Sequence, residues 1–112
     1  MQLPNEAERI RIFIGESDRH EGRLLSEVLV EKARSEGLAG ATAYRGIMGY
    51  GANSRVHTSK ILRLSEDMPL VIEIVDSTDK IDSFLKIIDS LITEGLVTRE
   101  PVQVIFYRHS GG

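Results

Sequence analysis

The sequence contains no cysteine among its 112 residues. Without a thiol, the chain has no disulfide, thiolate nucleophile, iron–sulfur cluster or Cys-ligated zinc site. It also lacks a long apolar run, because stretches such as residues 69–75 are far shorter than the roughly 20 residues that cross a bilayer as a helix. We therefore expect a protein that is not integral to a membrane.

An excess of positive charge is absent as well. The chain has 14 Lys and Arg residues against 17 Asp and Glu residues, for a net charge of -3. Broad nucleic-acid binding normally needs a basic domain with a clustered positive face, so we expect no nucleic-acid partner. The first residues carry Glu6 and Glu8 where a secretory signal is basic, and their apolar run is short. We expect a cytoplasmic protein.

The composition is typical of one globular domain that spans residues 1–112. Hydrophobic residues make up 41% of the chain and charged residues 28%. A domain of this size buries roughly two-thirds of its unfolded surface, which is enough to fold without a metal or a disulfide. The fold therefore requires no cofactor.

Hydropathy periodicity predicts strands and helices in the order βαββαβ. Alternating isoleucines indicate the first strand, and apolar residues at helical spacing indicate two amphipathic helices. Ser77 or Thr78 can cap the second helix and Gly95 can end it. The last strand covers residues 102–107, or begins at Leu96 and is interrupted at Pro101. The other expected elements are strands 9–14, 41–45 and 69–75 and helices 25–37 and 77–94.

This order predicts an α+β, ferredoxin-like fold, in which two helices cover one face of a four-stranded antiparallel sheet. The opposite face would then carry an apolar set of side chains that is too large to be left in water. We expect other copies of the chain to cover it. The expected residues on that face are Phe13, Tyr44, Val71, Val75, Ile105 and Tyr107.

A long glycine-rich segment lies between the second and third strands. Residues 45–65 read RGIMGYGANSRVHTSKILRLS, with four basic residues and no acidic one. Glycines permit close backbone approach, so backbone amides, hydroxyls and basic groups together could enclose a phosphate-bearing small molecule. The alternative is a solvated hairpin whose glycines serve turns. A loop of about twenty residues between neighbouring strands is uncommon in a compact domain and is usually functional or disordered, which favours the anion site.

The segment RGIMGYGANSRVHTSK, followed by LVIEIVD and PVQVIFYR, resembles the bacterial and archaeal family catalogued as domain of unknown function 190, whose members are relatives of the PII signalling proteins. The resemblance covers nearly the whole chain. It implies a ferredoxin-like subunit, a homotrimer packed through its sheets, and a long effector loop at residues 46–63. It further implies an adenine nucleotide (ATP, ADP, AMP or a cyclic nucleotide) in the clefts between subunits, and a target protein that reads the loop. An ion channel or transporter is a candidate target, because members of this family are encoded beside fluoride channels.

The resemblance also implies which residues bind the ligand. The PII proteins have a second phosphate loop of Gly-Asp-Gly-Lys type before the last strand, where this chain reads LVTREPVQV. Arg99 is the residue of that segment that could supply positive charge instead. The ligand-binding residues implied at the loop are Arg45, Gly46, Gly49, Gly51 and Ser54 at its base, with Arg55 and His57 further along.

The sequence shows no convincing catalytic or metal-binding constellation. His20 has carboxylates nearby but no second histidine at ligand spacing, so we expect no metal site there. We therefore expect a binding protein without a cofactor and without enzymatic activity. Two alternatives stay open: a small trimeric enzyme or metal-handling protein that uses the clefts between subunits, and a structural adaptor whose loop docks a partner without any ligand.

Overall fold

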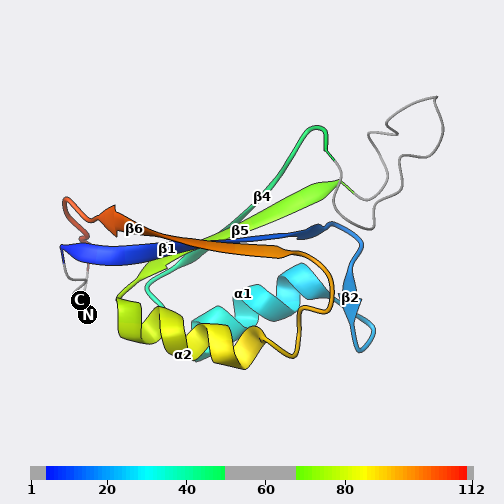
Figure 1. Cartoon of the computed structure of the whole chain (residues 1–112), viewed down its shortest axis with the longest axis horizontal. Helices are drawn as coiled ribbons and strands as arrows, with labels where there is room; N and C mark the ends of the chain where they lie inside the picture. Colours follow the sequence, from blue (N-terminus) through cyan, green and yellow to red (C-terminus); the bar gives the residue numbers. More distant parts are fainter. Residues whose placement is uncertain (1–4, 50–67, 111–112) are drawn as a thin grey trace.

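The computed structural model describes residues 5–49 and 68–110. These residues form one four-stranded sheet, two helices and a small hairpin that precedes the first helix. Both helices lie on the same face of the sheet, as Figure 1 shows. The elements are β1 (Glu6–Gly15), β2 (Arg19–His20), β3 (Arg23–Leu24), α1 (Leu25–Ser35), β4 (Ala41–Arg45), β5 (Pro69–Asp76), α2 (Thr78–Ile88) and β6 (Leu96–Gln103).

The strand order in the sheet is β4-β5-β1-β6, and every neighbouring pair is antiparallel. This topology confirms the predicted ferredoxin-like βαββαβ fold. The hairpin formed by β2 and β3 was not predicted from the sequence, because its strands have two residues each and show no periodicity. In the described parts of the chain, no helix is long and apolar enough to cross a membrane.

The core lies between the sheet and the helices. The register pairs Ile10 with Ile74 and Ile12 with Ile72, so four isoleucines meet on the helix side of the two central strands. Phe84 and Leu29 reach them from α2 and α1. Side chains alternate between the two faces of a strand, so a shift of one residue would expose this whole set. The burial pattern therefore specifies the register.

Local hydrogen bonds mark the end of α1 and the start of α2. Gly37, with φ of 77°, follows α1, and its N–H donates to the Arg34 carbonyl while the Leu38 N–H donates to the Ala33 carbonyl. This pair of bonds is a Schellman motif and confirms Gly37 as the predicted stop. At the start of α2, the Ser77 hydroxyl accepts a hydrogen bond from the Lys80 N–H at 3.4 Å, which confirms one of the two predicted caps.

The prediction that the second helix extends to residue 94 was wrong. The helix ends at Ile88, and the Leu91 N–H then donates to the Ile88 carbonyl across a tighter turn. Leu91 and Ile92 still pack against the core from this turn, which is why the apolar periodicity continues beyond the helix. Gly95 does not end the helix, because it stands next to the first residue of β6.

The last strand confirms the predicted alternative start at Leu96 but differs from the prediction at Pro101 and at its end. It covers Leu96–Gln103, and Pro101 lies within it instead of interrupting it. A proline fits there because β6 is an edge strand, where a missing N–H costs no ladder bond. Ile105 and Tyr107 therefore lie beyond the sheet and do not belong to its open face, contrary to expectation.

Candidate functional site

The base of the long loop is fastened to the start of β5. Gly46 follows directly on β4, and its N–H donates to the Pro69 carbonyl at 2.7 Å. A Cβ at Gly46 would lie 2.8 Å from the Pro69 Cγ, and one at Gly49 would lie 3.2 Å from the same atom. The backbone thus approaches the proline ring more closely than a side chain would allow. Two of the three predicted glycines therefore lie at the loop base, against one residue of the neighbouring strand.

Arg45 is the last residue of β4, and its guanidinium is paired with a carboxylate that sequence reasoning missed. Its Nε lies 2.7 Å from the Glu16 Oε2, and its Nη2 donates to the Glu16 Oε1 at 3.0 Å. Both side chains are partly exposed, at 54% for Arg45 and 34% for Glu16. Only the antiparallel packing of β1, β5 and β4 brings these two residues together. Glu16 directly follows β1 at the same end of the sheet, but this placement is visible only once the strand order is known.

Four of the predicted ligand residues, Gly51, Ser54, Arg55 and His57, lie outside the described residues. Their role stays a prediction. Within the described chain the site therefore consists of Arg45, Glu16 and the backbone of residues 46–49.

Arg99 does not join this group within one chain. It lies on β6, at the opposite edge of the sheet from β4. Its guanidinium is paired with Glu8 and, at 2.9 Å, with Asp82 of α2. These carboxylates hold Arg99 on the helix side of β6. Strands lie about 4.8 Å apart, so an arginine three strands away does not share a site with Arg45 in the same subunit.

The face of the sheet that the helices leave bare carries a charged network across all four strands. The Arg9 Nη2 lies 2.5 Å from the Glu100 Oε1, and Arg11 links Glu100 at 2.9 Å to Glu73 at 3.0 Å. The Tyr44 hydroxyl donates to the Glu73 Oε2 at 2.9 Å. These five residues come from β6, β1, β5 and β4, so the network ties the strands together on this face.

Apolar residues flank this network. Val71 stands opposite Phe13 in the register, and Phe13 stands opposite Leu96. At the other end of the face, Val75 stands opposite Arg9. Tyr44 and Leu96 are exposed. The open face is thus a band of ion pairs with apolar surface at one end and Val75 at the other. Four of the six residues predicted for this face do lie on it.

We expect the network to make the fold sensitive to acid. Arg11, and next the Tyr44 hydroxyl, lower the pKa of Glu73 below its usual 4.5, and Arg9 lowers that of Glu100. A carboxyl whose pKa is lower in the folded than in the unfolded chain stabilises the fold above the unfolded pKa, and the stabilisation is lost as the pH falls through the folded pKa. We expect the free energy of unfolding in urea to decrease as the pH falls below about 4.5, and to decrease less in Glu100→Gln. The exposed Glu94→Gln serves as control, and an equal loss in both variants would contradict the network's role.

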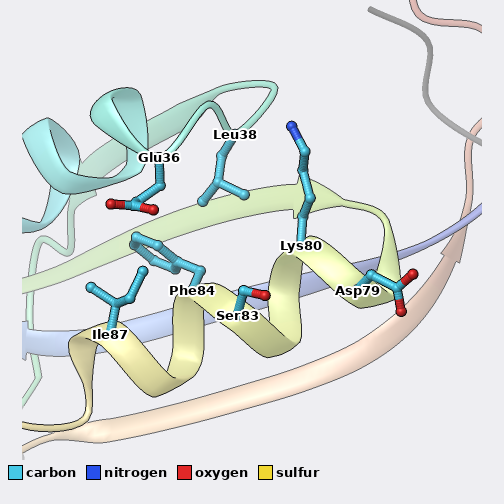
Figure 2. A pocket seen from close by; sticks show the side chains of 7 residues that line it. All are labelled: Glu36, Leu38, Asp79, Lys80, Ser83, Phe84 and Ile87. Carbon is cyan, nitrogen blue, oxygen red and sulfur yellow. The ribbon is translucent and has the colours of Figure 1, made fainter.

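A separate hollow of about 250 Å³ lies on the helix side, between α2 and the end of α1. Figure 2 shows Phe84 projecting from α2 towards the segment that carries Glu36 and Leu38. The Lys80 Nζ donates to the Gly37 carbonyl at 2.8 Å, so this ammonium group is already used at the end of α1. Pockets for drug-sized ligands usually measure about 300 to 1,000 Å³, which makes this hollow small for a nucleotide.

The described residues, 5–49 and 68–110, contain no cluster of three or more His, Cys, Asp or Glu side chains that could hold a metal ion. His20 lies 3.9 Å from the Glu21 carboxylate in the β2–β3 hairpin.

The sequence has named relatives. Residues 7–104 match the family DUF190, described as an uncharacterized ACR. A UPF0166 protein of Aquifex aeolicus (strain VF5) is 39% identical over 97 residues, which cover 87% of this chain and 91% of the relative. The UPF0166 protein MJ1524 of Methanocaldococcus jannaschii is 36% identical over 93 residues, which cover 82% of this chain and 85% of the relative.

Solved structures share the fold at lower identity. A putative PII-like signaling protein from Thermus thermophilus superimposes with a TM-score of 0.64 at 18% identity, over 94% of both chains. CPII from Thiomonas intermedia K12, in a structure bound to ADP and bicarbonate, superimposes with a TM-score of 0.63 at 17% identity, over 88% of both chains. Since the family match extends over residues 7–104 and both relatives exceed 30% identity, the chain belongs to the DUF190 family, and its fold is that of the PII-like proteins described above.

Proposed function

We propose that this chain is a PII-like regulatory protein that binds an adenine nucleotide between the subunits of a homotrimer. The long loop at residues 46–63 then carries the bound state to a partner protein. In this proposal the chain acts by binding and does not catalyse a reaction. The observation that carries it is the built loop base, where Arg45 and two glycines close against the start of β5.

The loop base has the chemistry that a phosphate needs. Gly46 and Gly49 lack side chains, which lets the loop base pack closely on Pro69 and fixes the backbone next to Arg45. Arg45 offers a planar guanidinium, which matches the geometry of a phosphate better than a lysine does. Its Cα is held by the sheet, because Arg45 pairs with Leu70 in the register of β4 and β5.

The choice of nucleotide draws on proteins of the same fold. CPII from Thiomonas intermedia K12 has been solved bound to ADP and bicarbonate, and also bound to ADP, AMP and bicarbonate. That protein is only 17% identical to this chain, so it supports a ligand class and not a set of contacts. ADP is accordingly the first probe.

The bare sheet face supports the homotrimer. A face on which apolar side chains flank a charged network is a surface that a second copy could cover. Arg99 on β6 could then contribute to a site only from a neighbouring subunit, as the PII resemblance requires of a cleft between subunits.

We expect Arg45→Gln to weaken ADP binding about tenfold to a hundredfold, because a hydrogen bond to a charged group contributes about 1.5 to 3 kcal/mol. Gly46→Val should also weaken binding, without a change of charge, because its Cβ would lie 2.8 Å from Pro69. Isothermal titration calorimetry with ATP, ADP, AMP and cyclic nucleotides measures both effects.

The matched control is Arg34→Gln, which removes the same charge from an exposed position at the end of α1. It should leave the affinity for ADP unchanged. If the wild-type protein binds none of these nucleotides at millimolar concentration, the nucleotide-sensor proposal is rejected in favour of an adaptor that works without a ligand. If Arg34→Gln and Arg45→Gln weaken binding equally, the site does not lie at the loop base.

A further inference from the structure

The Glu16–Arg45 pair is held in place by two neighbouring backbone bonds. The Glu16 N–H donates to the Met68 carbonyl at 2.8 Å, and the Gly46 N–H, next to Arg45, donates to the Pro69 carbonyl at 2.7 Å. Met68 and Pro69 are consecutive, so the backbones that carry the two side chains are fixed to the same point of the chain. The pair is therefore a built feature of the loop base and not a chance meeting of long surface side chains.

The Glu16 carboxylate occupies an edge of the Arg45 guanidinium that could also bind a phosphate. Glu16 contacts both Nε and Nη2 of Arg45, at 2.7 and 3.0 Å, and so occupies a two-point edge. Two-point contacts of this kind give arginine its preference for carboxylates and phosphates. Nη1 lies outside these contacts, but a phosphate bound there would lie close to the Glu16 carboxylate. Like charges at such separations repel each other even when solvent screens them.

We propose that Glu16 competes with the nucleotide phosphate for Arg45 and thereby sets how strongly the loop base binds an anion. This inference rests on the proposed nucleotide function and names a residue that regulates the same site. Because the Glu16 carboxylate already occupies the Nε and Nη2 edge of Arg45, a phosphate reaches this edge only by displacing the carboxylate. Glu16 thus selects for groups that carry more charge than a carboxylate.

The test is a double-mutant cycle on ADP binding by the full chain. Exposed ion pairs and repulsions between exposed charges are weak, so removing the Glu16 charge should change the dissociation constant for ADP only modestly. We expect Glu16→Gln to bind ADP about threefold to tenfold more tightly than wild type. In the Arg45→Gln background the same substitution should give a clearly smaller gain, because Glu16 then has no guanidinium to occupy and only its repulsion of the phosphate is removed. Calorimetry gives the four affinities, and thermal unfolding shows that each variant is folded.

The chain offers a matched control in another two-point pair. Glu31 accepts hydrogen bonds from Nη1 and Nη2 of Arg23 at 3.1 and 2.6 Å on an exposed surface, so Glu31→Gln removes the same charge from another two-point pair. It should leave ADP affinity unchanged.

The outcomes separate this inference from the function on which it rests. If wild type binds ADP but Glu16→Gln binds it equally or more weakly, competition is wrong while the nucleotide function stands. A gain that is equally large in the Arg45→Gln background also overturns competition, because Glu16 would then act by repulsion alone. If ADP binds to neither wild type nor any variant, the proposed function and this inference fall together.

Discussion

Replacing Val71 by glutamate is expected to separate the proposed trimer into monomers at micromolar concentration. Val71 lies on the open face of the central strand β5, next to Phe13, and is only 8% exposed within one chain. The new carboxylate would be largely buried in the single chain already and fully buried if another subunit covers this face, and burying a carboxylate without a partner is strongly unfavourable. Light scattering or analytical ultracentrifugation measures the change in mass.

A second variant distinguishes dissociation from unfolding. Leu96 lies on the same face and is 57% exposed in the single chain, so Leu96→Glu should leave the fold of the subunit intact. It should nevertheless weaken assembly, because its carboxylate would face the neighbouring subunit. Ser90→Glu adds the same charge to an exposed position after α2 and serves as the control.

The mass of the wild-type protein in solution is the most direct test of the proposed trimer. A monomeric wild type at micromolar concentration would reject the trimer and, with it, any site built between subunits. A trimer that survives both glutamate substitutions would place the subunit contact on another surface.

Replacing Phe84 by alanine is expected to lower the free energy of unfolding by about 3 to 5 kcal/mol. Phe84 is 1% exposed and packs among the isoleucines of β1 and β5, beneath the end of α1. Truncation removes the transfer free energy of the ring and leaves a cavity that the two helices cannot fill without moving. Chemical denaturation measures the loss.

Leu85→Ala is the matched control, because it places the same residue one position along the same helix. Leu85 is only partly buried, so its truncation leaves less cavity and should cost clearly less than that of Phe84. If both substitutions lowered the free energy of unfolding equally, the loss would come from helix propensity or from the unfolded chain and not from packing in the core.

Hydropathy alone was sufficient for most of the architecture. The alternation of Ile10, Ile12 and Ile14 with charged or aromatic neighbours specifies both the strand and the face that it buries, since successive side chains point to opposite sides. Gly37 and Ser77 mark the end of one helix and the start of the other through local backbone chemistry. Such signals act over a few residues, and the chain carries them without any long-range contact.

Element ends were less predictable when distant contacts decided them. The pattern of Leu91 and Ile92 continues that of α2, although the helix has already ended, because burial and helical hydrogen bonding are separate properties. Pro101 suggested an interruption, and only the place of β6 at the edge of the sheet makes a proline harmless there.

The candidate site likewise has some features that the sequence shows and others that only the tertiary structure shows. The glycines and the basic residues of the loop are visible in the sequence, and so is the expectation of an anion near Arg45. The carboxylate that holds this guanidinium lies 29 positions away in the sequence, and Arg99 is held by Glu8 and Asp82 at the other edge of the sheet. The sequence by itself showed that glycines and basic residues gather in the loop. Tertiary structure alone decided which charges meet, because ion pairs depend on the distance between side chains in space and not on their separation along the chain.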